Sequence, residues 1–309
     1  MKTGNIIVSI TCLTYNHAPY ISRCLDGFIN QVTDFPFEIL IHDDASIDGT
    51  SNIIREYETK YPDIINPIYQ IDNQYSRGVD VFSNNVSRAK GKYIALCEGD
   101  DYWIDPYKLQ KQVDLLEAEE HDGIVAVATN CSVSDLNGNV IKKERLVIPP
   151  VNEEGVYTLH DFLKNSHQYP TLTVVFRNRD MNFILENMKK LSNPFLGDWI
   201  LWVLLYQQGS FYFMNQVTAS YRINPNSITH TVNAVKRWEE DFVIRRKLIE
   251  LLPIEYHKYL NDDTYAYFMI GMAYRKGHNY FKFLLFSIRA FFSNPLRCLS
   301  LVKRTLLKK

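Results

Sequence analysis

The sequence predicts an α/β protein whose central sheet is mostly parallel. Short apolar runs rich in β-formers alternate with segments that carry apolar residues at helical spacing. Strand, helix, strand, helix at short spacing is typical of βαβ units. A polar cluster also follows three of the apolar runs, at 15–17, 43–46 and 98–101. Because the carboxyl ends of parallel strands share one edge of a sheet, we expect these clusters to meet in one crevice.

The predicted strands and helices of the first half follow from these patterns. The expected strands are Ile6–Thr14, Phe37–Ile41, Ile64–Tyr69, Tyr93–Cys97 and Ile124–Thr129. Helical faces are expected after Pro19 (Ile21, Leu25, Phe28, Ile29), at Ile53, Ile54 and Tyr57, at Val81, Phe82, Val86 and Ala89, and from Pro106 to about Glu120.

The alternation loosens after about Cys131. Asn137-Gly138 predicts a hairpin turn, and Gly209 ends an apolar helix that starts at Trp199. Short strands are expected at Thr171–Phe176, Phe211–Phe213 and Val217–Tyr221. Only helical patterns remain from Val232 onward, so we predict a domain over 1–230 and a helical region over 231–309.

The composition is that of an ordinary globular protein. The chain has 309 residues, of which 46% are hydrophobic and 22% charged, and its net charge is −1. This size allows one large α/β domain with an appendage, and a charge so near zero gives no sign of nucleic-acid binding. No stretch of 18 apolar residues predicts a spanning helix, and the N-terminus lacks a signal-peptide pattern.

The five cysteines are odd in number and form no CxxC pair. We interpret them as small buried hydrophobic residues in a reducing, cytoplasmic compartment, rather than as a disulfide or zinc framework. They are Cys12, Cys24, Cys97, Cys131 and Cys298.

The segment EGDD, residues 98–101, places three carboxylates directly after an apolar run. Negative charge is costly there unless solvent, a cation or hydrogen-bond donors reach it. Hard oxygen ligands suit Mg²⁺ or Mn²⁺, which also bridges to phosphate oxygens. A helix cap by Asp101 or Asp105 is the alternative, and it explains one aspartate but not Glu98 and Asp100 as well.

Four motifs in order, CLTYN, HDDASIDGT, AKGKYIALCEGDDYW and FLGDW, resemble the inverting nucleotide-sugar glycosyltransferases of family 2, which have the GT-A fold. The resemblance covers about Ile6 to Ser227. It implies a metal-dependent enzyme that moves one sugar, of hexosyl type, from a nucleotide sugar to a hydroxyl. The resemblance favours a UDP-sugar as the donor. It implies that the acceptor is a glycan or a lipid-linked molecule in cell-surface polysaccharide synthesis.

The first two motifs are the expected nucleotide site. A carboxylate of Asp43 or Asp44 can accept from the uracil N3–H, and Ser46 can add a hydroxyl contact. The resemblance implies that Asp44 and Tyr15 lie around the base, with Thr14 nearby. Helix capping is the alternative for the carboxylates and hydroxyls later in this loop.

In the acidic motif, Glu98 stands where the family usually has the first aspartate of Asp-x-Asp. The resemblance implies that Glu98 faces the ribose and that Asp100 coordinates the metal, Mg²⁺ or Mn²⁺. Asp101 either supports this site or caps the next helix.

Asp198 is the expected catalytic base, because inverting transfer needs a carboxylate to take the proton from the acceptor hydroxyl. The family usually has an acidic pair at this place, whereas this chain has Gly197 before Asp198. The alternative is an N-cap for the helix that begins at Trp199, and one residue can do both.

Residues Tyr221–His230 resemble the loop that closes over the diphosphate. Arg222 is a candidate for phosphate binding, and Asn224 stands where many relatives have histidine. His230 either replaces that histidine or is an exposed loop residue. The QxxRW signature of processive relatives is absent, since Ala234 stands in place of its glutamine, so transfer of one sugar per event is expected.

The C-terminal stretch Phe281–Leu307 is apolar with interspersed basic residues, and Pro295 divides it into two helices. No Asp or Glu follows Asp263, which favours a helix lying on an anionic membrane surface. The alternative is packing on the core or on a second copy in a homodimer.

Two other functions remain to be separated from sugar transfer. The first is a non-catalytic nucleotide-sugar binder of the same fold. Gly197 and Asn224 support this alternative, because they stand where the family usually has an acidic residue and a histidine. A nucleotidyltransferase is disfavoured, because CLTYNHAPY has neither the glycine nor the lysine of a phosphate-binding loop.

Overall fold

The structure is a computed structural model that describes residues 4–118, 123–144, 153–165, 169–191, 196–225, 227 and 234–306. Contacts within the chain divide it into two units. The first comprises Met1–Ser192 and Asp198–Asn224, and the second Asn193–Gly197 and Pro225–Lys309. The division predicted at residue 230 falls within 228–233, outside the described residues.

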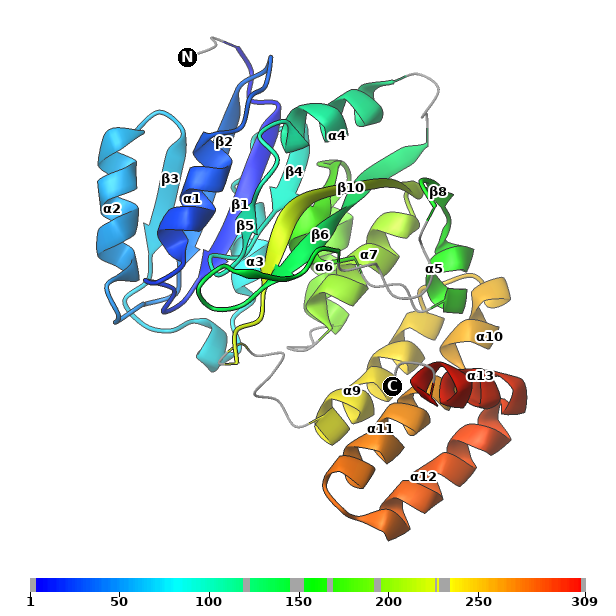
Figure 1. Cartoon of the computed structure of the whole chain (residues 1–309). Coiled ribbons are helices and arrows are strands. Elements are labelled where there is room, and N and C mark those ends of the chain that lie inside the picture. The colour runs from blue at the N-terminus through cyan, green and yellow to red at the C-terminus, as the bar shows by residue number, and fades with distance from the viewer. Residues whose placement is uncertain are drawn as a thin grey trace. The chain divides into compact units, whose positions relative to one another are not determined.

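The first unit contains the sheet, shown in Figure 1. Its strands pair in the order β3-β2-β1-β4-β9-β6-β10-β5, with β7 on β6 and β8 on β10. They are β1 (Val8–Thr14), β2 (Phe37–Asp43), β3 (Ile65–Tyr69), β4 (Tyr93–Leu96), β5 (Tyr102–Trp103), β6 (Ile124–Ser134), β7 (Val140–Lys142), β8 (Gly155–Tyr157), β9 (Val174–Arg177) and β10 (Ser210–Arg222).

The sheet is mixed, and its parallel part carries the predicted motifs. Strands β3, β2, β1 and β4 are parallel, so their carboxyl ends lie at one edge. Strand β9 is antiparallel to both β4 and β6, β10 is parallel to β6, and β5 runs antiparallel to β10. The predicted α/β fold with a central sheet flanked by helices is confirmed. The parallel order predicted for this sheet is found in its β3, β2, β1 and β4 part.

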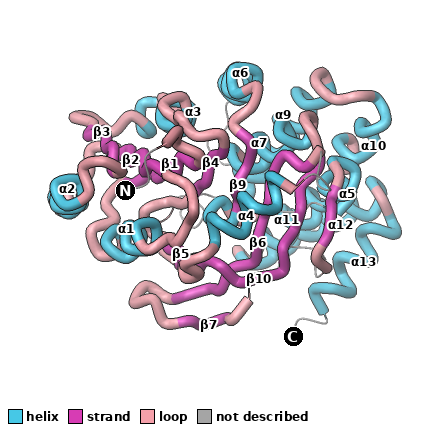
Figure 2. Tube along the Cα trace, turned by 90° about the horizontal axis from the view of Figure 1, so that it is seen from above, coloured by secondary structure: helices cyan, strands magenta, loops and turns pink. Residues whose placement is uncertain are grey.

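Helices flank the sheet on both faces; α1 and α3 lie on opposite sides in Figure 2. The helices of the first unit are α1 (Ile21–Ile29), α2 (Thr50–Lys60), α3 (Val81–Val86), α4 (Lys108–Glu117), α5 (Leu159–Asn165), α6 (Met181–Leu191) and α7 (Gly197–Tyr206), with 3₁₀ turns η1 (Tyr75–Arg77) and η3 (Thr171–Thr173). Every residue of α7 from Trp199 onward is buried, as its all-round apolar sequence requires.

Two strand predictions need correction. Residues 211–213 and 217–221 belong to a single strand, β10, whose register against β6 shifts between Met214 and Ala219, so a bulge replaces the expected turn. The stretch predicted as a strand from Thr171 begins instead with η3, because Thr173 donates from both its N–H and its hydroxyl to the Pro170 carbonyl. Strand β9 starts at Val174.

The core of the first unit lies between the strands and their helices. Strand β4 is buried along its whole length, and β1 is buried except for Leu13. The five cysteines are free and buried, as predicted. Four of them, Cys12, Cys24, Cys97 and Cys131, belong to one apolar cluster.

The second unit is helical in its described residues, as expected. Its elements are α9 (Ala234–Ile249), η4 (Ile254–Tyr256), α10 (His257–Leu260), α11 (Thr264–Lys276), α12 (Tyr280–Ser293) and α13 (Pro295–Leu306). A buried ion pair joins Asp241 to Arg245 at 2.6 Å, and Arg297 of α13 bonds Asp262 at 2.8 Å. None of the helices in the described part of the chain has the length and apolarity needed to cross a bilayer.

Candidate active site

The loops after β1 and β2 interlock at the carboxyl edge of the sheet. The Asn16 N–H donates to Ser46 Oγ, and the Ile47 N–H donates back to Asn16 Oδ1, both at 2.9 Å. The His17 N–H donates to Thr50 Oγ1 at 2.8 Å. Asn16 and Ala45 adopt the left-handed conformation at the centre of the two loops. The expected proximity of the first two motifs is therefore met.

The two adjacent aspartates at the end of β2 are buried and hold their surroundings together. Asp43 accepts from the Ser46 N–H and from the hydroxyls of Ser46 and Ser51. Asp44 accepts from the N–H groups of Gln74 and Tyr75, at 2.7 and 3.0 Å. A nucleotide base that contacts these carboxylates therefore meets groups that already accept hydrogen bonds from the protein.

Tyr15 and Thr14 differ in exposure. The Tyr15 ring is 43% exposed at the end of β1, so it is accessible to a planar ligand. Thr14 is buried, and its Oγ1 lies 3.2 Å from His17 Nδ1. Burial lowers the pKa of His17, although the charge of Asp100 opposes this effect. A neutral imidazole is therefore favoured beside the acidic motif.

Gly99 brings the acidic motif against the end of β1. Its N–H donates to the Leu13 carbonyl at 3.0 Å. A Cβ at this position would lie 2.6 Å from Thr14 Oγ1 and 3.0 Å from His17 Nδ1, too close for any side chain. Glycine is thus required where the two loops touch.

The three carboxylates of the acidic motif have different environments. Asp100 Oδ2 accepts from Asn224 Nδ2 at 3.2 Å and lies 3.8 Å from His17 Nε2. Glu98 Oε2 accepts from Thr171 Oγ1 at 2.7 Å. Asp101 is buried and accepts from the Arg222 N–H at 2.7 Å, so it fixes β10 rather than capping α4.

The electrostatics of Glu98 link this motif to Asp198. Burial raises the pKa of Glu98 to about 7, and the charges of Asp100 and Asp198 add to the effect, while the bond from Thr171 opposes it. Asp198 is exposed at the start of α7, where its Oδ1 lies 2.7 Å from the Trp199 N–H. The charge of Asp198 thus acts on the acidic motif, and α7 begins at Gly197 rather than at the predicted Trp199, so Asp198 lies in the first turn of this helix.

The donor chemistry at this edge suits a divalent cation that is held together with phosphate. Among the residues that the structure describes, no group of three His, Cys, Asp or Glu side chains is arranged to hold a metal ion alone. Mg²⁺ is usually bound by one or two carboxylates plus substrate phosphates, and Asp100 can supply one such carboxylate.

Arg222, the candidate for phosphate binding, is buried and donates to backbone carbonyls. It is 4% exposed, its Nε donates to the Asp100 carbonyl at 2.8 Å, and its Nη1 donates to the Leu136 carbonyl at 2.7 Å. The guanidinium also lies 4.7 Å over the Tyr20 ring. In this structure Arg222 positions the acidic loop, and a phosphate contact would require these bonds to be exchanged. His230 lies outside the described residues.

Comparison with known proteins decides the family. The model described as Glycosyl transferase family 2 matches residues 9–188, more than half of the chain. The chain belongs to glycosyl transferase family 2. The predicted resemblance is therefore confirmed at the level of the family.

Relatives of this family 2 chain include proteins named for glycan synthesis. It is 26% identical over 232 residues to a Bacillus subtilis glycosyltransferase named for teichuronic acid biosynthesis, TuaG, covering 74% of this chain and 84% of that one. It is 32% identical over 235 residues to an uncharacterised protein of Mycobacterium tuberculosis, covering 75% of this chain. The chain spans 64% of the length of that mycobacterial relative.

Solved structures share the fold. Residues 1–349 of S. aureus TarS, in complex with UDP-GlcNAc, align with a TM-score of 0.64 at 15% identity, covering 95% of this chain and 83% of that one. The mannosyltransferase PcManGT of Pyrobaculum calidifontis, in complex with GDP-Man and Mn²⁺, aligns with a TM-score of 0.54 at 15% identity, covering 99% of this chain and 81% of that one. At such identities the likeness shows the fold alone.

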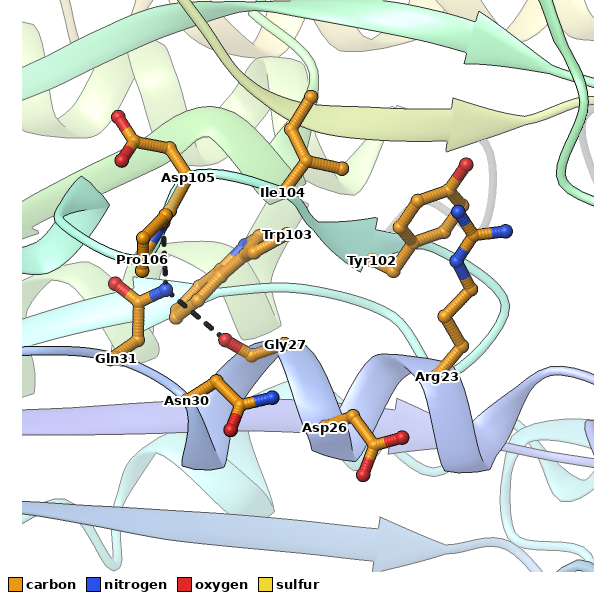
Figure 3. Close-up of a pocket in the computed structure, with 10 residues that line it drawn as sticks. All are labelled: Arg23, Asp26, Gly27, Asn30, Gln31, Tyr102, Trp103, Ile104, Asp105 and Pro106. Atoms are coloured by element: carbon orange, nitrogen blue, oxygen red, sulfur yellow. Dashed lines mark hydrogen bonds between the residues drawn. The ribbon is translucent and has the colours of Figure 1, made fainter.

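A pocket of about 300 Å³ lies between α1 and β5 of this family 2 domain (Figure 3). Gln31 Nε2 donates to the carbonyls of Gly27 and Asp105, at 3.1 and 2.9 Å. The Arg23 guanidinium lies 3.8 Å over the Tyr102 ring. None of the predicted site residues lines this pocket.

Sequence reasoning missed three residues that contact the acidic motif. His17 and Asn224 lie beside Asp100, and Thr171 bonds Glu98. His17 carried a signal, since it ends the polar cluster after β1. The sequence shows Asn224 as a departure from the family pattern but gives no sign of its contact with Asp100. Thr171 carried none, because its contact joins residues 73 positions apart.

Proposed function

We propose that this protein is an inverting glycosyltransferase that moves one sugar from a nucleotide sugar, with a UDP-sugar as the favoured donor, to a hydroxyl of a glycan or lipid-linked acceptor. The observation that carries the proposal is the contact between the loop after β1 and the acidic motif in a family 2 domain, where His17 Nε2 lies 3.8 Å from Asp100 Oδ2. The charge of Asp198 acts on Glu98 in the same motif. The name of the relative TuaG supports a cell-surface polysaccharide as the product.

The base is assigned to Asp198. An exposed carboxylate at the start of α7 takes the proton from the acceptor hydroxyl as its oxygen attacks the anomeric carbon. The new C–O bond forms as the bond to the diphosphate breaks on the opposite face, which inverts the configuration.

The nucleotide is assigned to the edge formed by the first two loops. The exposed Tyr15 ring offers a face for the base, while Asp43, Asp44 and Ser46 hold the loop that surrounds it. Glu98 is assigned to the ribose. A bound Mg²⁺ or Mn²⁺ would neutralise diphosphate charge as the sugar leaves. Asp100 would hold this cation, and Asp101 and Arg222 position the loop that presents Asp100.

The test is nucleotide release from a panel of UDP-, GDP- and dTDP-sugars, with Mn²⁺, Mg²⁺ or EDTA and with candidate acceptors. We expect one donor class to be turned over only with a cation. Asp198→Asn should lower the rate by on the order of 10²–10⁴. It should change the melting temperature little, because the side chain is exposed in the first turn of α7 and asparagine has nearly the same shape. Asp180→Asn, at an exposed surface aspartate, is the matched control.

A nucleotide-sugar binder without catalysis is the second candidate. Gly197 before the assigned base and Asn224 in place of a histidine favour it. This candidate predicts donor binding in calorimetry without product from any donor and acceptor pair. Equal rates for Asp198→Asn and the unmodified protein would remove Asp198 from the mechanism, and failure to bind any nucleotide would contradict both candidates.

A further inference from the structure

One side of α12 packs within the second unit and the opposite side does not. Ala290 is completely buried, and Gly271 of α11 lies under α12, where a Cβ would be 3.5 Å from the Phe283 carbonyl and from Phe286 Cβ. These contacts define the packed side. Phe283 and Phe286 are accordingly less exposed than their neighbours.

The other side of α12 is an exposed apolar surface. With residues spaced about 100° apart around a helix, its members fall within an arc of about 140°. Phe281 and Phe292 are 78% and 79% exposed, and a contiguous apolar patch on a surface marks an interaction site. This surface, the outer face of α12, consists of Tyr280, Phe281, Leu284, Leu285, Ile288, Phe291 and Phe292. Leu296 and Leu299 add exposed apolar groups on α13.

The charges around the outer face are of one sign. Lys282 and Arg289 lie at its border, and their cationic ends rest 4.9 and 5.1 Å from the rings of Tyr274 and Phe286. No acidic residue occurs after Asp263, whereas residues 264–309 include nine lysines and arginines. An apolar stripe with a purely cationic border is complementary to an anionic surface that has an apolar interior.

We propose that the outer face of α12, with the adjoining exposed residues of α13, docks on an anionic phospholipid bilayer, lying in its interface. The 14 residues of α12 are too few to span, since a spanning helix needs about 20. A second copy is a poorer partner, because joining two such faces would bring two cationic borders together without acidic residues of these helices to pair with them. This inference goes beyond the proposed transfer reaction and does not depend on it.

The experiment is co-sedimentation of the whole 309-residue chain with vesicles of phosphatidylcholine alone or mixed with phosphatidylglycerol, at low and high salt. We expect binding to the anionic vesicles and its loss at high salt. The double variant Phe281→Ser/Phe292→Ser should weaken binding by about tenfold or more, because two aromatic rings no longer enter the bilayer. Lys282→Gln/Arg289→Gln should weaken it by on the order of tenfold.

Ile254→Ser is the matched control. Ile254 is 82% exposed in the same unit but outside α12 and α13, so this variant should bind vesicles as the unmodified protein does. Circular dichroism and thermal melting check that the variants fold, which their exposed positions favour. Absence of binding to anionic vesicles, or equal binding by the Phe281→Ser/Phe292→Ser variant, would overturn the proposal. So would a dimer in sedimentation equilibrium that this variant dissociates without any vesicle binding.

Discussion

Carboxylates at the same edge of the sheet have two different environments. In the loop after β2, Asp43 and Asp44 accept several hydrogen bonds from backbone N–H groups and hydroxyls of that loop and of residues 74–75. In the acidic motif, Glu98 has a hydroxyl partner, yet burial and the charges of Asp100 and Asp198 raise its pKa to about 7. The first group stabilises the fold, and the second gathers repelling charge where a cation and a diphosphate would relieve it.

This comparison predicts that substitutions in the two groups affect different measurements. A carboxylate that organises a loop should matter for the free energy of unfolding. A carboxylate that holds a cation should matter for turnover and for metal-dependent binding, with little effect on unfolding.

The largest effect is expected for Asp100→Asn. Loss of the assigned metal ligand should lower the rate of nucleotide release by on the order of 10³, since a Lewis acid contributes several kcal/mol. The increase in melting temperature that Mn²⁺ and UDP give the unmodified protein should disappear. Without metal, the variant should be no less stable, because one of the repelling charges near Glu98 is removed. A variant that unfolds more readily in urea while still responding to Mn²⁺ would place Asp100 in the structural group instead.

The next effect is expected for Asp44→Asn, in the opposite measurement. An amide places an N–H₂ group against one of the two N–H donors of Gln74 and Tyr75, so one bond is lost and two donors face each other. We expect the free energy of unfolding to fall by about 1.5–3 kcal/mol in urea titrations. Asp180→Asn makes the same substitution at an exposed aspartate, and it should alter the free energy of unfolding by less than about 0.5 kcal/mol. Equal stability of the two variants would contradict the distinction.

The sequence could predict this edge but not the difference between its two groups. Apolar runs ending in DDAS and EGDD locate the carboxylates, because strand periodicity and βαβ order are local signals. The partners that decide their roles come from distant residues. Thr171 reaches Glu98, Asn224 reaches Asp100 and the Arg222 guanidinium turns inward to two carbonyls. Such contacts depend on how β10 and η3 pack, and no periodicity encodes that.

The same reason explains why the sequence predicts two strands where the structure has the single strand β10. Asn215 and Gln216 are exposed polar residues in its middle, which resemble a turn in sequence. In the structure the strand continues, because β6 pairs with it on both sides of the bulge.

Gly99→Ala should affect both measurements moderately. The added Cβ would meet Thr14 Oγ1 and His17 Nδ1, so the acidic loop must move away from the end of β1. Overpacking of this kind costs about 1–3 kcal/mol, and displacement of Asp100 should lower turnover by on the order of tenfold or more. Gly4→Ala, where the nearest atom is 3.9 Å away on Pro36, provides the control. Unchanged donor turnover in Gly99→Ala would show that this contact does not set the position of the acidic motif.

The smallest effect is expected at a buried lysine, Lys108, and concerns the pH dependence of stability. Lys108 is completely buried, its Nζ donates to Gln112 Oε1 at 2.6 Å, and burial lowers its pKa to about 7. Between pH 7 and the usual lysine pKa near 10.4, the unfolded chain then binds more protons than the folded one. Stability contributed by this group therefore rises with pH in that window, by at most about 1.4 kcal/mol per pH unit.

Lys108→Met should remove this slope from urea titrations between pH 7.5 and 9, as judged by the difference from the unmodified protein. Identical slopes would mean that Lys108 stays charged in its buried site, and that one amide oxygen and the Trp103 ring, 4.4 Å from Nζ, are sufficient partners for a cation there.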